Sequence, residues 1–264
     1  MHETLSSLVE RALNGNRRPL EFYLRDQSRL PGKRANLELI SELSNLLGAV
    51  VPEYPKQTRA LVMYFLQEGE HVEANTPGEF VVLCGLVASG ACAAALAGWR
   101  GEIFELLGRY AGSTSWRVRE AVSMGFQQLL PAASEQTITY LMMLAAEGNN
   151  FQQRASIAAV AEPRLLHTPE IINAALSIQR IVLERVRSVP AAERKRDDFR
   201  VLRQALGYTL SVVTAAAPEK GFALMRQSAS WNDPDINWVL RENLKKKRLA
   251  KFVEHTEKLT RMLA

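Results

Sequence analysis

"SWRVREAVSMGFQQLL", residues 115–130, opens with an aromatic residue after a polar cap and continues with apolar residues at helical spacing. Three further segments share this pattern, including an arginine three or four residues after the aromatic. They are "NFQQRASIAAVAEPRLL" from Asn150, "DFRVLRQALGYTLSVV" from Asp198 and "NWVLRENLKKKRLAKF" from Asn237. The four arginines are Arg119, Arg154, Arg203 and Arg241, so the pattern returns after 35, 49 and 38 residues. Repeats of this length, each built from two helices, are typical of an α-solenoid.

The rest of the chain has the same helical periodicity. Apolar residues recur at three- and four-residue spacing, separated by short breaks with Pro, Gly, Asn or Asp, and strand-like alternation is nearly absent. We therefore predict an all-α protein. The expected helices span residues 3–14, 18–28, 35–50, 55–68, 79–97, 101–111, 115–130, 134–147, 150–161, 169–187, 197–215, 218–229, 235–247 and 249–262.

The repeated segments resemble HEAT repeats of the ARM-type α-solenoid family, in which a turn acid and an arginine of the second helix link neighbouring repeats. Two segments carry the turn acid, as Asp197/Asp198 and Asp233/Asp235, whereas Ser113 to Ser115 and Asn149/Asn150 replace it in the others. "LPGKRANLEL", residues 30–39, also resembles a segment of bacterial HEAT-like proteins. The resemblance implies one α-solenoid domain over residues 1–264, with a divergent N-terminal cap at 1–50 and HEAT-like repeats at 55–262.

An uncharged apolar segment, residues 80–97, reaches the lower length limit of a membrane span. Its second half consists of Ala, Gly, Ser and Cys, which gain little from lipid, so we expect a buried core helix and no membrane span. Small residues in the segment would let other helices approach closely; they are Gly85, Ala88, Ser89, Gly90 and Ala93. Both cysteines of the chain, Cys84 and Cys92, lie here, where thiols are inert. The N-terminus has no signal-peptide pattern, and a reduced, cytoplasmic setting is expected.

Positive charge is concentrated towards the C-terminus. The net charge is −3 over residues 1–179 and +8 over residues 180–264, which favours an anionic partner at that end. On the expected helix 235–247, Arg241, Lys245 and Arg248 fall at i, i+4 and i+7 and would form one continuous cationic face. The candidate binding residues are Arg119, Arg154, Arg203, Arg241, Lys245, Lys246, Lys247 and Arg248. The alternative is that the repeated arginines pair with turn acids, in which case "KKKR" at 245–248, absent from the sister segments, is the main functional candidate.

Motifs for nucleophilic, nucleotide-dependent or metal-dependent catalysis are not found in the sequence, so we expect no metal site and no cofactor. One resemblance points to an enzyme. The HEAT-like alkylpurine DNA glycosylases use an acid four residues after a tryptophan and a later arginine, and Trp116, Glu120 and Arg154 stand in that order here. The acid is Glu instead of Asp, and Trp116 also occupies the aromatic position of the repeat, where a core anchor is the alternative.

The expected function is therefore a non-catalytic scaffold. Its partner would be a protein or an anionic molecule such as nucleic acid, bound on the concave, C-terminally basic face. The alternative expectations are a DNA-binding repair glycosylase and a pure protein–protein adaptor. Sequence alone does not choose among the three.

Overall fold

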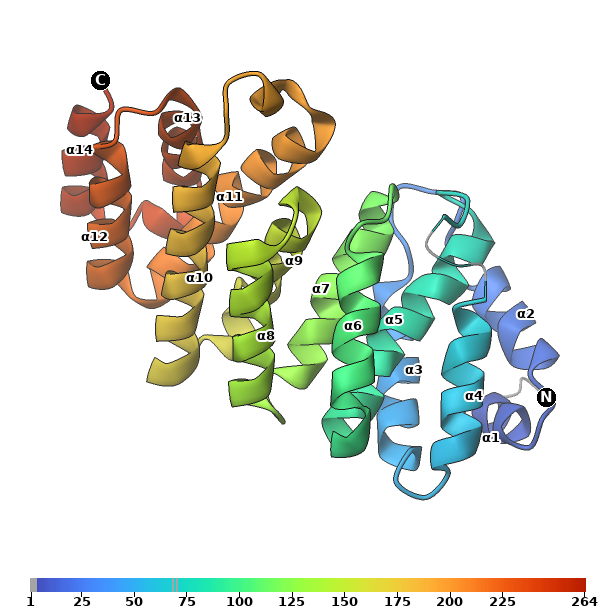
Figure 1. Ribbon diagram of the computed structural model, residues 1–264. Helices are drawn as coiled ribbons and strands as arrows, with labels where there is room; N and C mark the ends of the chain where they lie inside the picture. Colours follow the sequence, from blue (N-terminus) through green and yellow to red (C-terminus); the bar gives the residue numbers. More distant parts are fainter. Residues whose placement is uncertain (1–3, 68, 70) are drawn as a thin grey trace. The chain divides into compact units, whose positions relative to one another are not determined.

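The computed structural model describes residues 4–67, 69 and 71–264, and over these residues the chain consists of helices joined by short loops (Figure 1). The α-helices are α1 (Leu5–Leu13), α2 (Arg18–Asp26), α3 (Leu37–Val50), α4 (Pro55–Phe65), α5 (Pro77–Ala95), α6 (Arg100–Tyr110), α7 (Trp116–Leu129), α8 (Ser134–Glu147), α9 (Asn150–Val160), α10 (Pro169–Ser188), α11 (Asp197–Ala216), α12 (Pro218–Ala229), α13 (Pro234–Leu244) and α14 (Val253–Met262). The prediction of an all-α protein is confirmed, and each expected helix has a counterpart. The expected helix ends at residues 3 and 68 lie outside the described residues.

The chain forms two compact units, Met1–Thr137 and Ile138–Ala264, which we call the N-terminal unit and the C-terminal unit. Helix α8 begins in the first and continues into the second. The single domain over residues 1–264, with a cap at 1–50, stays a prediction.

Helix α5 forms the centre of the N-terminal unit. It packs most extensively against α3 and α7 and also contacts α2, α4 and α6. The helix begins where the Thr76 hydroxyl accepts a hydrogen bond from the Glu79 amide at 3.1 Å, with Pro77 in the first turn. Residues 78–93 are all buried, which confirms the expected core helix. By length and composition α5 could cross a membrane, the one such helix in the described part of the chain, but most of it is covered by its neighbours.

Glycine brings α5 close to α7. A Cβ atom built on Gly90 would lie 2.2 Å from the carbonyl oxygen of Gly125, and one on Gly85 would lie 2.8 Å from Cδ2 of Leu66. Real Cβ atoms do not approach other atoms so closely, so these two positions admit only glycine without a shift of the backbone or of Leu66. The expected role of small residues in close helix packing is confirmed for Gly85 and Gly90.

In the C-terminal unit, α11 packs against both α9 and α13, while α10 contacts α9, α11, α12 and α13 (Figure 1). Helix α14 packs on α12 and α13. Among the residues that the structure describes, five phenylalanines are fully buried, and two of them, Phe199 on α11 and Phe222 on α12, belong to this unit.

Polar side chains link the N-terminal ends of successive packed helices in both units. Asn150 of α9 donates from its amide to the carboxylate of Asp198 in α11 at 3.0 Å. Arg203 of α11 forms an ion pair with Asp235 of α13. In the N-terminal unit, Glu79 of α5 accepts a hydrogen bond from the hydroxyl of Ser115, which caps α7. An arginine of a neighbouring helix therefore pairs with Asp235, whereas Asp198 is bound by Asn150 and by Arg196, and the HEAT resemblance stays a prediction.

The contact between Asn150 and Asp198 predicts an acid-sensitive contribution to stability. Partial burial alone raises the pKa of Asp198, but hydrogen bonds from Asn150 and Arg196 outweigh it and hold the pKa below its usual range. A lowered pKa in the folded state stabilises the protein above the unfolded pKa, and this stabilisation is lost as pH falls through the folded value. We expect Asn150→Ala to lower the free energy of unfolding by about 1 kcal/mol at neutral pH and by less at about pH 3. Urea unfolding at the two pH values measures this, and Asn16→Ala, at an exposed loop asparagine, should show no such pH dependence.

Both cysteines, Cys84 and Cys92, are buried on α5 and are free thiols. Burial raises the pKa of Cys92 to about 12 and raises the pKa of Cys84 still further. Because only the thiolate reacts, we expect neither cysteine to be modified by a thiol reagent at neutral pH in the folded protein, and both to be modified in denaturing urea. Mass spectrometry of the labelled protein counts the modified thiols. Fast labelling without denaturant would contradict the buried position of α5.

Candidate functional site

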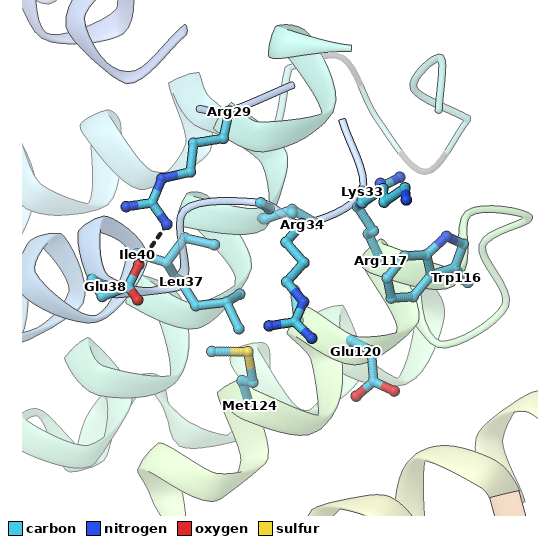
Figure 2. Close-up of a pocket in the computed structure, with 13 residues that line it drawn as sticks. Arg29, Lys33, Arg34, Leu37, Glu38, Ile40, Trp116, Arg117, Glu120 and Met124 are labelled. Atoms are coloured by element: carbon cyan, nitrogen blue, oxygen red, sulfur yellow. Dashed lines mark hydrogen bonds and ion pairs between the residues drawn. The ribbon is translucent and has the colours of Figure 1, made fainter. Parts of the chain in front are cut away.

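A pocket of about 440 Å³ lies in the N-terminal unit, between the loop that follows α2 and the first three turns of α7 (Figure 2). We call it the N-terminal pocket. It is lined by Arg29, Lys33, Arg34 and Ala35 of the loop, by Leu37, Glu38 and Ile40 of α3, by Leu83 of α5, and by Trp116, Arg117, Glu120, Ala121 and Met124 of α7.

Hydrogen bonds within the loop hold its backbone in place. The Asn36 side chain accepts from the Leu39 amide at the start of α3 and donates to the carbonyl of Gln27 at 2.9 Å. The hydroxyl of Ser28, which is fully buried, accepts from the amide of Leu30 at 3.1 Å. The amide of Gly32 donates to the side-chain oxygen of Asn75 at 2.9 Å, so partners inside and outside the loop together hold its backbone.

Arg117 fastens the loop to α7. Its guanidinium donates to the carbonyl of Gly32 at 2.6 Å and lies 3.6 Å from the carboxylate of Glu79, which is fully buried. The same guanidinium stacks on the ring of Trp116, 4.7 Å from the ring centroid. Trp116 is nevertheless 54% exposed, so one face of its indole is open to a ligand.

The charges of the pocket are unevenly compensated. Arg29 forms an ion pair with Glu38 at 3.2 Å, and Figure 2 shows it turned towards that carboxylate. Arg34 extends from the loop towards Met124 on α7 (Figure 2). Lys33 and Arg34 are exposed, and neither has an ion pair among the described residues. Two cations are therefore available to an anionic group at this rim.

The floor of the pocket is apolar. Ile40 and Leu83 are buried beneath it, and Ala121 and Met124 follow on the same face of α7 as Arg117. An apolar floor, an open indole face and two unpaired cations suit a ligand that has a flat apolar part next to a negative charge. The described residues include no group of three or more His, Cys, Asp or Glu side chains arranged for a metal ion.

Trp116 and Glu120 line the same pocket, as their spacing on one helix predicts. The alternative in which Trp116 anchors the core is wrong, because the side chain is more than half exposed. Phe199, at the matching position of α11, is buried and does serve as a core anchor. The difference arises because the indole of Trp116 lies at the edge of the open pocket (Figure 2).

The arginines of the repeated pattern have structural partners. Arg119 is buried and donates to the carbonyls of Ser113 and Thr114, which close the turn before α7. Arg154, on α9 in the C-terminal unit, is also buried and is not among the residues lining the N-terminal pocket. The contacts of Arg119 and the burial of Arg154 favour the structural alternative over a phosphate-binding track.

The same is true of the two later arginines. Arg203 pairs with Asp235 and stacks on Trp238, 4.4 Å from the ring centroid. Arg241 donates to the carbonyl of Leu263 and so ties α13 to the C-terminus of the chain.

The expected continuous cationic face at the C-terminus is wrong. Helix α13 ends at Leu244, Lys245 caps it, and the chain then turns into a short 3₁₀ turn at Lys247–Leu249. The turn brings Leu249 into the core, where it is fully buried and its segment contacts α11. Burying this leucine is incompatible with continuing α13, so Arg241 and Arg248 do not share a helix face.

The "KKKR" side chains themselves remain at the surface. Lys245 pairs with Glu242 at 2.5 Å while 66% of its side chain is exposed, and Lys247 and Arg248 are exposed without an ion pair among the described residues. Lys246 is half-buried. The binding role of these four residues stays a prediction.

Sequence reasoning did not identify Glu79 or the pocket-forming role of the loop. "TPGE" at 76–79 has the spacing of a helix start, which is a local signal. The partner of Glu79, however, is Arg117, 38 positions later, and no local pattern names it. Arg29, Lys33 and Arg34 lie close together in the sequence, but no local pattern places them beside Trp116.

Comparisons of the chain with protein-family profiles, with curated proteins and with solved structures found no match.

Proposed function

We propose that this protein is a non-catalytic binding scaffold of the HEAT type, and that it binds single-stranded nucleic acid through the N-terminal pocket. The observation that carries the proposal is the open face of Trp116 beside Lys33 and Arg34, two exposed cations without an ion pair among the described residues. Proteins that bind single strands without sequence preference combine such a stacking aromatic with cations that contact phosphates.

The α-solenoid architecture is part of the same proposal. It is supported by two side-chain links between the N-terminal ends of packed helices, Asn150 with Asp198 and Arg203 with Asp235. It is also supported by the stacking of α9, α11 and α13 next to one another. The buried, free thiols of Cys84 and Cys92 support the proposed reduced, cytoplasmic setting.

The binding test uses fluorescence anisotropy with a labelled single-stranded oligonucleotide over a series of salt concentrations. We expect the logarithm of the binding constant to fall linearly with the logarithm of salt concentration. The double variant Lys33→Ala/Arg34→Ala should weaken binding at least about tenfold at low salt and flatten the salt slope by about 1.4. Trp116→Leu should weaken binding by about 1–3 kcal/mol while leaving the salt slope unchanged, because it removes stacking and no charge.

The matched control is Arg18→Ala/Lys56→Ala, which removes the same charge from exposed positions of the same unit outside the pocket. It should weaken binding much less. Equal weakening in both double variants, or no binding at low salt, would exclude the pocket as a nucleic-acid site. A defined protein that co-purifies, without salt-steep oligonucleotide binding, would support an adaptor instead.

The C-terminal cations are a second contact in this proposal. Lys247 and Arg248 are exposed in the turn after α13 and have no ion pair among the described residues. We expect Lys247→Ala/Arg248→Ala to reduce the salt slope by a similar amount, because each phosphate contact contributes about equally. If only the pocket variant changes the slope, the C-terminal cations are solvated surface.

A DNA glycosylase that removes alkylated bases is the second candidate. It is favoured by one observation: Trp116 and Glu120 line the same pocket, and the tryptophan is open to it. The test is release of alkylated bases from methylated DNA. Glu120→Gln should abolish that release while oligonucleotide binding is retained, and the absence of release by the unmodified protein excludes the activity.

A further inference from the structure

A second concave site lies wholly in the C-terminal unit, between α10 and α12. Each helix contributes four residues at positions i, i+3, i+4 and i+7, which is one face of a helix. They are Asn173, Leu176, Ser177 and Arg180 of α10, and Lys220, Ala223, Leu224 and Gln227 of α12. The space that they enclose measures about 310 Å³, and we call it the α10–α12 groove.

The walls of the groove carry two cations and three neutral polar groups. Lys220 donates from Nζ to the side-chain oxygen of Asn173 at 2.9 Å, which holds the ammonium at one end of the groove. Arg180 is exposed and has no ion pair among the described residues. Ser177 and Gln227 add a hydroxyl and an amide to the lining of the groove.

Carboxylates are absent from the described residues that line the groove. Glu219, next to Lys220 in the chain, does not line it and instead lies 3.1 Å from Nε2 of His255. The positive charge of the groove is therefore not cancelled from within.

The bottom of the groove is closed by Leu176 and Leu224, both buried. Ala223 is small and exposed, which leaves room beside Ser177 for a group of a few heavy atoms. Two cations that face a small cavity with neutral hydrogen-bonding groups match a dianion with several acceptor oxygens.

We propose that the α10–α12 groove binds a terminal phosphate group, either as free inorganic phosphate or as a phosphate monoester. A phosphate monoester carries a charge of about −1.5 to −2 at neutral pH, which matches the two cations, and its oxygens accept from the hydroxyl and the amides. This site shares no residue with the N-terminal pocket, so its failure and the failure of the proposed nucleic-acid binding are separate outcomes.

The test is isothermal titration of the full chain with inorganic phosphate and with a dinucleotide that carries a 5′-phosphate, against the same dinucleotide without it. Arg180→Gln and Lys220→Gln should each weaken phosphate binding at least about tenfold, because each removes a charge-assisted hydrogen bond. The matched controls are Arg185→Gln, on another face of α10, and Lys195→Gln, both at exposed cations outside the groove. They should change binding by less than about twofold.

A third variant separates a shaped site from diffuse charge. Ser177→Leu fills the groove but keeps both cations, and its exposed helical position tolerates leucine, as circular dichroism will verify. We expect it to abolish phosphate binding.

The proposal is overturned if the unmodified protein binds no phosphate probe, if the control variants weaken binding as much as the groove variants, or if Ser177→Leu binds normally. Tighter binding of the 5′-phosphorylated dinucleotide than of inorganic phosphate identifies an ester as the ligand, and weaker binding of the dinucleotide identifies free phosphate.

Discussion

Replacing Glu79 by alanine is expected to lower the free energy of unfolding by about 3–5 kcal/mol, because it leaves the buried cation Arg117 without its counter-charge. Glu79 is fully buried, and its carboxylate also accepts from the amide of Asn75 at 2.8 Å and from the hydroxyl of Ser115. One side chain therefore joins the start of α5 to the start of α7. Urea unfolding followed by circular dichroism measures the effect.

The control for this prediction is Glu102→Ala. Glu102 pairs with Arg59 at 2.6 Å, a shorter distance than the 3.6 Å between Arg117 and Glu79, but both partners are about half exposed. We expect that variant to cost less than about 1 kcal/mol, because water screens an exposed pair. Replacing Arg117 by methionine in the Glu79→Ala background should recover part of the loss, because no buried charge then remains unpaired. Equal effects of Glu79→Ala and Glu102→Ala would contradict the importance of burial.

A different substitution of Glu79, to glutamine, tests how the N-terminal pocket is assembled. Arg117 holds the carbonyl of Gly32 and stacks on Trp116, and Glu79 fixes its position. We therefore expect Glu79→Gln, which keeps the volume of the side chain, to weaken ligand binding at the pocket without contacting the ligand. A loss of stability with unchanged binding would show that the pocket does not depend on Glu79 for its shape.

Replacing Gly90 by alanine is expected to destabilise the protein by about 3 kcal/mol, in spite of the better helix propensity of alanine. The added Cβ would lie 2.2 Å from the carbonyl oxygen of Gly125, so α5 and α7 would have to move apart. Both helices pack the centre of the N-terminal unit, and their separation would expose apolar surface and leave gaps.

Gly101→Ala is the matched control for Gly90→Ala. Gly101 lies in the first turn of α6, and a Cβ built there meets no atom within 4 Å. That substitution should leave the free energy of unfolding unchanged or raise it by up to about 1 kcal/mol. The added Cβ meets no neighbour there, so only the higher helix propensity of alanine affects stability. If the two alanine substitutions have the same effect on stability, the close approach of α5 and α7 does not require glycine at position 90.

The order of the helices could be predicted from the sequence because the signals are local. Thr76 and Ser115 cap α5 and α7 with their hydroxyls, and Pro169 lies in the first turn of α10, each within a few residues of the helix start it marks. The buried position of α5 was likewise predictable, because a helix with no polar face must be covered on all sides. The residue at which α13 ends could not be predicted from the sequence, because it depends on the burial of Leu249 against α11.

The candidate sites likewise include some features that the sequence predicts and others that depend on tertiary contacts. Trp116 and Glu120 could be placed on one helix face from their spacing, and "KKKR" was visible as a charge run. The sequence alone thus determined the all-α class, the helix order and the buried central helix, since capping, periodicity and apolar composition act over one or two turns. Only the tertiary structure decided that Glu79 holds Arg117, that Lys33 and Arg34 lie beside an open tryptophan, and that Arg180 and Lys220 face one groove. These pairs are separated by 38 or more residues in the chain, and their proximity depends on how whole helices pack.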